Sequence, residues 1–149
     1  MATVEVAFTP LPAHVRTARL VATAVARRSG VDEALLDEVR LAVGEACSRA
    51  VEVHRRHCPA EPVRIEMTDQ GERFVVVVRD AAPTIQTQAP EAGADPAERA
   101  PQSAEDGALA IPAGFGLAVI SGLADDVRVS STSSGVSVRM SWPSAPATA

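Results

Sequence analysis

Aromatic residues are scarce in this chain, which has three Phe, one Trp and no Tyr among 149 residues. Proteins that bind nucleic acid usually present a basic surface, often with aromatic side chains interleaved for stacking on bases. This chain has no basic stripe of that kind, and its formal net charge is −5 at pH 7. We therefore expect no direct contact with nucleic acid.

Long apolar runs are also absent. A helix that crosses a membrane needs about 20 mostly apolar residues, and no stretch of the chain approaches that length. The first residues, Met-Ala-Thr-Val-Glu-Val, lack the basic start and the apolar run of a secretory signal. We expect neither a membrane span nor a signal peptide.

Cysteine is limited to Cys47 and Cys58. If one helix holds both, their eleven-residue separation corresponds to about 16 Å, which is too far for a disulfide. Two reduced thiols are typical of a cytoplasmic protein. The length of the chain favours one domain with a real core.

The most strongly patterned stretch, residues 36–57, predicts a long helix. Apolar or histidine positions recur at steps of three and four, which marks one helical face; they are Leu35, Val39, Val43, Ala46, Ala50, Val53 and His57. Another face carries Glu45, Arg49 and Glu52. Glu followed by Arg four residues later is a favourable surface ion pair, so this face is either merely solvated or functional.

The last turn of this predicted helix contains His54, Arg55, Arg56 and His57. Positive charge there would complement the helix dipole. A metal site using these histidines and Cys58 is the alternative, but no matching pair of ligands occurs elsewhere in the chain.

The remaining patterns predict further elements in a definite order. We expect strands at 3–8, 63–67, 74–78, 127–131 and 136–142, helices at 13–29 and 117–123, and Asp32 as the N-cap of the long helix. Strands grouped in hairpins with helices between the groups predict an α+β fold. We expect a two-layer sandwich with a mixed, mostly antiparallel sheet and helices on one face, formed by residues 1–142, with a flexible tail at 143–149.

Residues 81–112 differ sharply in composition from the rest of the chain. They include ten Ala, five Pro, no aromatic residue, and five acidic residues against one arginine. Such a sequence cannot build a packed core. We interpret it as a mobile lid, or alternatively as an inert insertion.

Three boxes in order give the chain a specific resemblance: Leu41-Ala-Val-Gly-Glu45-Ala46, Val78-Arg79-Asp80 and Gly114-Phe115-Gly116-Leu117. They resemble the anti-sigma factor/serine kinase family of the RsbW and SpoIIAB type. That family has the Bergerat (GHKL) ATPase fold of the histidine kinases. The resemblance covers residues 4–142 and implies binding of ATP or ADP under a lid at 81–112.

The resemblance also implies roles for individual residues. Glu45 corresponds to the general base that activates a serine hydroxyl of a partner protein, a task suited to a positioned carboxylate. Asp80 corresponds to the aspartate that accepts a hydrogen bond from the adenine amino group. Residues 114–117 correspond to the phosphate-binding box, in which Gly114 and Gly116 let backbone amides approach the phosphates. Those glycines could instead serve only a tight turn.

Arg19, in the first predicted helix, corresponds to an arginine that contacts partner proteins in that family. Its alternative role is that of a solvated helix arginine. The family also implies a homodimer, for which the strand at 3–8 is one candidate edge.

The chain departs from the family pattern at the magnesium position and after the adenine strand. The family has a magnesium-binding asparagine four residues after the glutamate, whereas this chain has Arg49, which cannot ligate a metal. Arg49 could pair with Glu45 and occupy the base, or contact the phosphates in place of the metal. After the adenine strand, Ala82 and Thr84 stand where the family has glycines, and the methyl group of Ala82 could crowd the purine.

Three functions remain open at this point. The first is an anti-sigma factor that sequesters a sigma factor, is countered by a STAS-domain antagonist, and binds nucleotide with weak or absent kinase activity. The second is an active serine-protein kinase that phosphorylates the STAS antagonist. The third is a protein-binding module without nucleotide.

Overall fold

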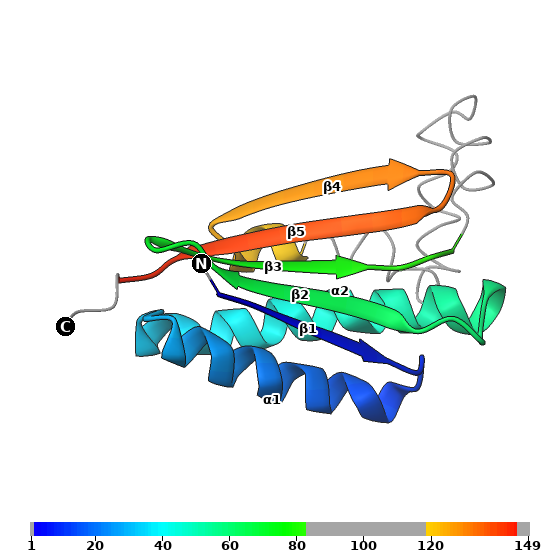
Figure 1. Cartoon of the computed structure of the whole chain (residues 1–149), viewed down its shortest axis with the longest axis horizontal. Helices are drawn as coiled ribbons and strands as arrows, with labels where there is room; N and C mark the ends of the chain where they lie inside the picture. The colour runs from blue at the N-terminus through cyan, green and yellow to red at the C-terminus, as the bar shows by residue number, and fades with distance from the viewer. Residues whose placement is uncertain (1, 83–118, 146–149) are drawn as a thin grey trace.

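The structure is a computed structural model that describes residues 2–82 and 119–145. Its elements follow the predicted order, as Figure 1 shows. They are β1 (Ala2–Phe8), α1 (Pro12–Arg28), η1 (Glu33–Leu35), α2 (Leu36–His57), β2 (Val63–Asp69), β3 (Arg73–Arg79), β4 (Asp126–Thr132) and β5 (Gly135–Pro143). Residues 119–123 are also helical. Neither α1 nor α2 is long and apolar enough to cross a membrane.

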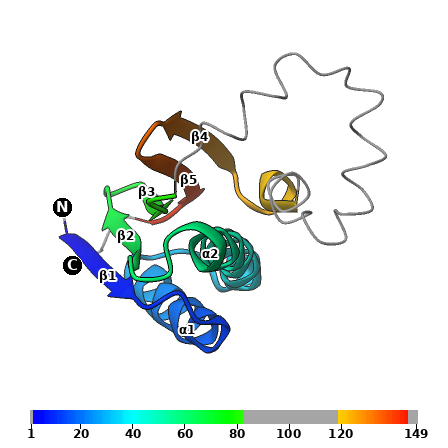
Figure 2. The same cartoon turned by 90° about the vertical axis from the view of Figure 1, so that its right-hand side faces the viewer.

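The five strands form one sheet in the order β1-β2-β3-β5-β4, and each neighbouring pair is antiparallel. Helices α1 and α2 lie side by side on one face of this sheet (Figures 1 and 2). The predicted two-layer α+β sandwich is therefore confirmed. The expectation of a mixed sheet is wrong for the described strands, because β5 turns back from β4 and inserts between β4 and β3.

Local sequence explains how the two helices begin and end. Pro12 opens α1, and Gly30 follows its end with a φ of +92° that favours glycine. The side chain of Asp32 accepts a hydrogen bond from the Ala34 N–H, so it caps the short turn η1. The prediction that Asp32 caps the long helix directly is therefore wrong by one turn, since η1 intervenes before α2.

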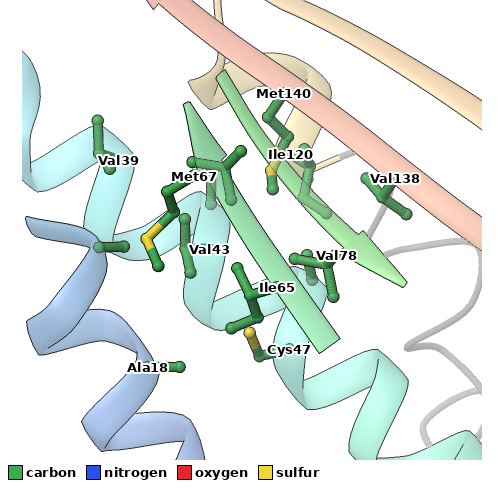
Figure 3. Packing of buried hydrophobic residues seen from close by; sticks show 14 of the residues in the cluster. Ala18, Val39, Val43, Cys47, Ile65, Met67, Val78, Ile120, Val138 and Met140 are labelled. Atoms are coloured by element: carbon green, nitrogen blue, oxygen red, sulfur yellow. The ribbon is translucent and has the colours of Figure 1, made fainter. Parts of the chain in front are cut away.

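The core lies between the sheet and the two helices. Figure 3 shows how Val43 and Cys47 of α2 face Ile65 and Met67 of β2. The largest fully buried side chains are Trp142, Phe74, Ile65, Met67, Ile120 and Met140. The Trp142 Nε1–H donates to the Leu123 carbonyl at 3.1 Å, which ties the helical turn at 119–123 to β5.

The segment after β5 is anchored at its start. The Ser144 N–H donates to the Glu72 carbonyl at 3.0 Å, and the Ala145 N–H donates to the Gly30 carbonyl at 2.9 Å. The predicted tail at 143–149 therefore begins with held residues, and residues 146–149 lie outside the described part.

Candidate functional site

Asp80 follows the end of β3 and is held by several contacts. Its backbone N–H donates to the Val136 carbonyl at 2.9 Å. Its Oδ1 accepts from the N–H groups of Ala82 at 3.1 Å and Val136 at 3.2 Å. The side chain is 1% exposed. The carboxylate of Asp80 is thus buried and fixed beside the first residues of β5.

Arg49 is the charged partner of Asp80. Its Nη1 donates to Asp80 Oδ2 at 2.8 Å, and the arginine side chain is 11% exposed. Within the described residues, Arg49 Nε is buried without a hydrogen-bond partner. The ion pair joins α2 to the end of β3, which sequence reasoning did not foresee.

Glu45 lies one turn before Arg49 on α2 and is half-buried. The described residues offer it no hydrogen bond or ion pair, so the predicted alternative in which Arg49 pairs with Glu45 is wrong. The guanidinium turns toward the sheet instead, where the buried carboxylate of Asp80 needs a counter-charge.

Ala82 is fully buried, and its N–H contributes to holding Asp80. The other predicted binding residues, Gly114, Phe115, Gly116 and Leu117, lie outside the described residues. So does most of the proposed lid at 81–112.

His54 has a different role from the one predicted. It is fully buried, its Nε2 accepts the Ala81 N–H at 2.8 Å, and its Nδ1 lies 2.8 Å from the Glu61 carbonyl. An acceptor Nε2 and a donor Nδ1 define a neutral imidazole. His54 therefore fixes the backbone next to Asp80, and the prediction that its charge complements the helix dipole is wrong.

Metal binding by the helix end finds no support in the described residues. They contain no group of three His, Cys, Asp or Glu side chains that could hold an ion. Cys47 and Cys58 are both free, as predicted.

Arg19 of α1 packs directly against Gly44 of α2. A Cβ on Gly44 would lie 2.5 Å from Arg19 Nε, so the missing side chain of Gly44 provides the space that Arg19 occupies. Arg19 Nε is buried without a hydrogen-bond partner in the described part of the chain. Burial raises the pKa of the nearby Cys47 thiol to about 12, with the charge of Arg19 opposing that rise. Arg19 is thus a half-buried packing residue rather than a fully solvated one.

The comparisons with known proteins agree with this architecture. A sequence model described as the histidine kinase-like ATPase domain matches residues 8–142. The chain belongs to the histidine kinase-like ATPase domain family. This membership implies a nucleotide site and confirms the predicted histidine kinase-like (GHKL) ATPase fold.

A solved structure supports the same fold. The crystal structure of the RsbU and RsbW domains of Rv1364c from Mycobacterium tuberculosis is similar to the chain, with a TM-score of 0.65 and 15% identity. The match covers 99% of this chain and 34% of that one, so the chain spans about a third of that protein's length. Among curated proteins, none matches this chain.

The residues present do not fit the magnesium ion of the family. The position expected to supply an amide oxygen holds Arg49, whose guanidinium has only donors and points to Asp80. Asp80, which the family resemblance predicts to recognise adenine, already accepts three hydrogen bonds from this chain.

Sequence signals existed for one of the missed residues. His54 continues the spacing of Val43, Cys47 and Val51, all of which are buried on α2. An apolar helix face drawn through these three residues would have placed His54 in the core. The Arg49–Asp80 pair had no such signal, because 31 residues separate the partners and only the packing of α2 on the sheet brings them together.

Proposed function

We propose that this chain is an anti-sigma factor that works by partner switching in the cytoplasm. It sequesters a sigma factor and is countered by a STAS-domain antagonist. Its nucleotide site binds ATP or ADP without a magnesium ion of the family's kind and has weak or absent kinase activity. Membership in the histidine kinase-like ATPase family supports the nucleotide site, and the free cysteines support a reducing compartment.

The observation that carries the catalytic part of this proposal is the Arg49–Asp80 ion pair. A kinase of this fold needs a metal to neutralise charge on the transferred phosphoryl group. Arg49 replaces the metal ligand and is committed to Asp80. Phosphoryl transfer is therefore expected to be slow, while the surface that binds partners is kept.

Binding to purified partners tests this function. The sigma factors and STAS-domain proteins of the same genome should be titrated against the chain pairwise, then in competition. The proposal expects one sigma factor to bind and one STAS protein to displace it. If no sigma factor binds at micromolar concentrations, the proposal is wrong.

The unpaired state of Glu45 favours a second candidate function, an active serine kinase. A free, half-buried carboxylate on α2 is available as a base. Transfer of labelled phosphate from ATP to the STAS protein, abolished in Glu45→Gln, would establish this function. Turnover that appears only in Arg49→Asn would support the first.

A third reading, a protein-binding module without nucleotide, would follow if ATP changed neither partner's affinity. A nucleotide can bias partner exchange only by binding the two complexes differently. The family resemblance also implies a homodimer, which light scattering on the purified chain would test. Strand β1 at the sheet edge is one surface for that contact.

A further inference from the structure

The ion pair between Arg49 and Asp80 sits on the one side chain that the family resemblance assigns to recognition of the base. Both partners are largely withdrawn from water, with 11% and 1% of their side chains exposed. A buried carboxylate deprived of its cation is strongly disfavoured. The paired arrangement is therefore the stable state of Arg49 and Asp80 in the absence of a competing donor.

Asp80 has little capacity left for another donor. An ionised carboxylate offers about four acceptor positions, and three are used by Ala82, Val136 and Arg49. Two of these donors are backbone N–H groups, which hold the carboxylate in place and cannot leave without disturbing β5. Arg49 is the only partner that a side-chain movement can remove.

The contact of Arg49 is suited to exchange. It uses a single hydrogen bond, from Nη1, rather than the two parallel bonds of a bidentate arginine–carboxylate pair. Arg49 Nε finds no acceptor among the described residues. The guanidinium is thus held at one point and keeps unused donors that another acceptor can attract.

We propose that Arg49 is a built-in competitor of the adenine ring, whose amino group and the guanidinium donate to the same carboxylate of Asp80. In the structure Arg49 donates to this carboxylate, and a 6-aminopurine donates to it in turn only when Arg49 leaves. This inference rests on the nucleotide site of the proposed function and adds its regulation. When only a fraction of molecules is competent to bind, the apparent affinity falls by that fraction.

The test uses adenosine, which has the base but no phosphate that could itself attract Arg49. Its binding to wild type, Arg49→Gln and Arg49→Asn should be measured by calorimetry and by shift in melting temperature. Arg56→Gln is the matched control, because Arg56 lies on the same helix and pairs with Glu52 at the surface. Competition predicts that adenosine binds both Arg49 variants at least about tenfold tighter than wild type and the control.

Guanosine binding to the same variants tests whether the effect is specific for adenine. Its base presents a carbonyl acceptor where adenine presents an amino donor, so the gain should be restricted to adenosine. An equal gain for guanosine, or equal adenosine affinity in wild type and both folded variants, would overturn the proposal. The absence of adenosine binding in all of these proteins would overturn it as well.

A measurement on the unaltered chain covers the case in which the variants unfold. Arginine side-chain ¹⁵N spectra report whether the Arg49 guanidinium is hydrogen-bonded and restrained. Competition predicts that millimolar adenosine releases that restraint, while unchanged Arg49 signals at this concentration contradict it. Failure here would leave sigma-factor binding untouched, because partner titrations measure the proposed function separately.

Discussion

The α-carbon of Gly135 faces the carbonyl group of Asp80 so closely that a Cβ there would lie 1.9 Å from the oxygen. Gly135 also has a φ of +145°, a conformation that side chains rarely adopt. The start of β5 can therefore reach Asp80 only because this position is glycine. The contact makes the turn between β4 and β5 part of the site.

Gly135→Ala should destabilise the chain by about 2 kcal/mol or more, because a strained φ and a clash with backbone atoms add together. Gly71→Ala is the control, since Gly71 has a φ of +91° and nothing within 4 Å of an added Cβ. The control should cost about 1 kcal/mol from strain alone. Urea unfolding measures both, and equal losses would show that the close approach to Asp80 has no energetic effect.

Removing the His54 imidazole should break its hydrogen bonds to the Ala81 N–H and the Glu61 carbonyl and leave a cavity where a fully buried side chain stood. A lost hydrogen bond costs about 0.5–1.5 kcal/mol and the cavity adds to this, so His54→Ala should lower the free energy of unfolding by about 2 kcal/mol or more. His57→Ala alters an exposed histidine three residues later and should change stability by less than about 0.5 kcal/mol. Similar losses of stability in the two variants would contradict a stabilising role for the hydrogen bonds of His54.

The buried thiol of Cys47 should make stability depend on pH in the alkaline range. Its pKa is raised to about 12 by burial, whereas an unfolded thiol ionises near the ordinary value. Above about pH 9 the unfolded chain loses protons that the folded chain retains, so stability falls as pH rises, with a slope of up to about 1.4 kcal/mol per pH unit.

Unfolding curves between pH 8 and pH 11 check this prediction, with Cys47→Ala as the comparison. The chain contains no Tyr and no Lys, whose ordinary titration would overlap with that of the thiol. The slope should flatten in Cys47→Ala, although Cys58, whose pKa is also raised by burial and by Asp80, contributes in the same direction. If the free energy of unfolding of Cys47→Ala fell with pH as steeply as that of the unaltered chain, the Cys47 thiol would not be the source of this pH dependence.

Adding a methyl group at Gly44 should displace Arg19 without unfolding the chain. The predicted clash is with Cγ, Cδ and Nε of Arg19, which belong to a flexible side chain rather than to backbone, and alanine is favoured over glycine inside a helix by about 1 kcal/mol. Gly44→Ala should keep or raise the melting temperature. If Arg19 contacts partners, the same variant should weaken sigma-factor or STAS binding; a fall in melting temperature would mean that Arg19 cannot move aside.

The sequence carried enough information for the layers of the fold. The alternation of Val4, Val6 and Phe8 predicted β1, and the steps of three and four along residues 36–57 predicted α2, because burial on one side of an element leaves a period in the chain. The antiparallel insertion of β5 between β3 and β4 could not be read in this way. Pairing order depends on contacts between segments that the period of each segment does not encode.

The candidate site was predictable in part. The boxes at Glu45 and Asp80 singled out both residues as candidates, and the substitution at Arg49 marked the departure from the family pattern. The partner of Arg49 could not be deduced, because a helix face gives a direction but not the residue that lies opposite. His54 was misinterpreted because a basic residue in the last turn of a helix is expected to complement the helix dipole, and histidine is intermediate in its tendency to be buried.

The sheet order also bears on how the chain folds. Arg73 of β3 and Ser141 of β5 are hydrogen-bonded neighbours, although 68 residues separate them in the chain. Pairing of such distant strands requires closure of a long loop before any contact offsets its entropy, which slows folding. The hairpins β2–β3 and β4–β5 have partners close in the chain, so they can form before β1 and β5 take their places in the sheet. The central position of β5 then makes completion of the sheet, and with it the assembly of Asp80 and its neighbours, a late event in folding.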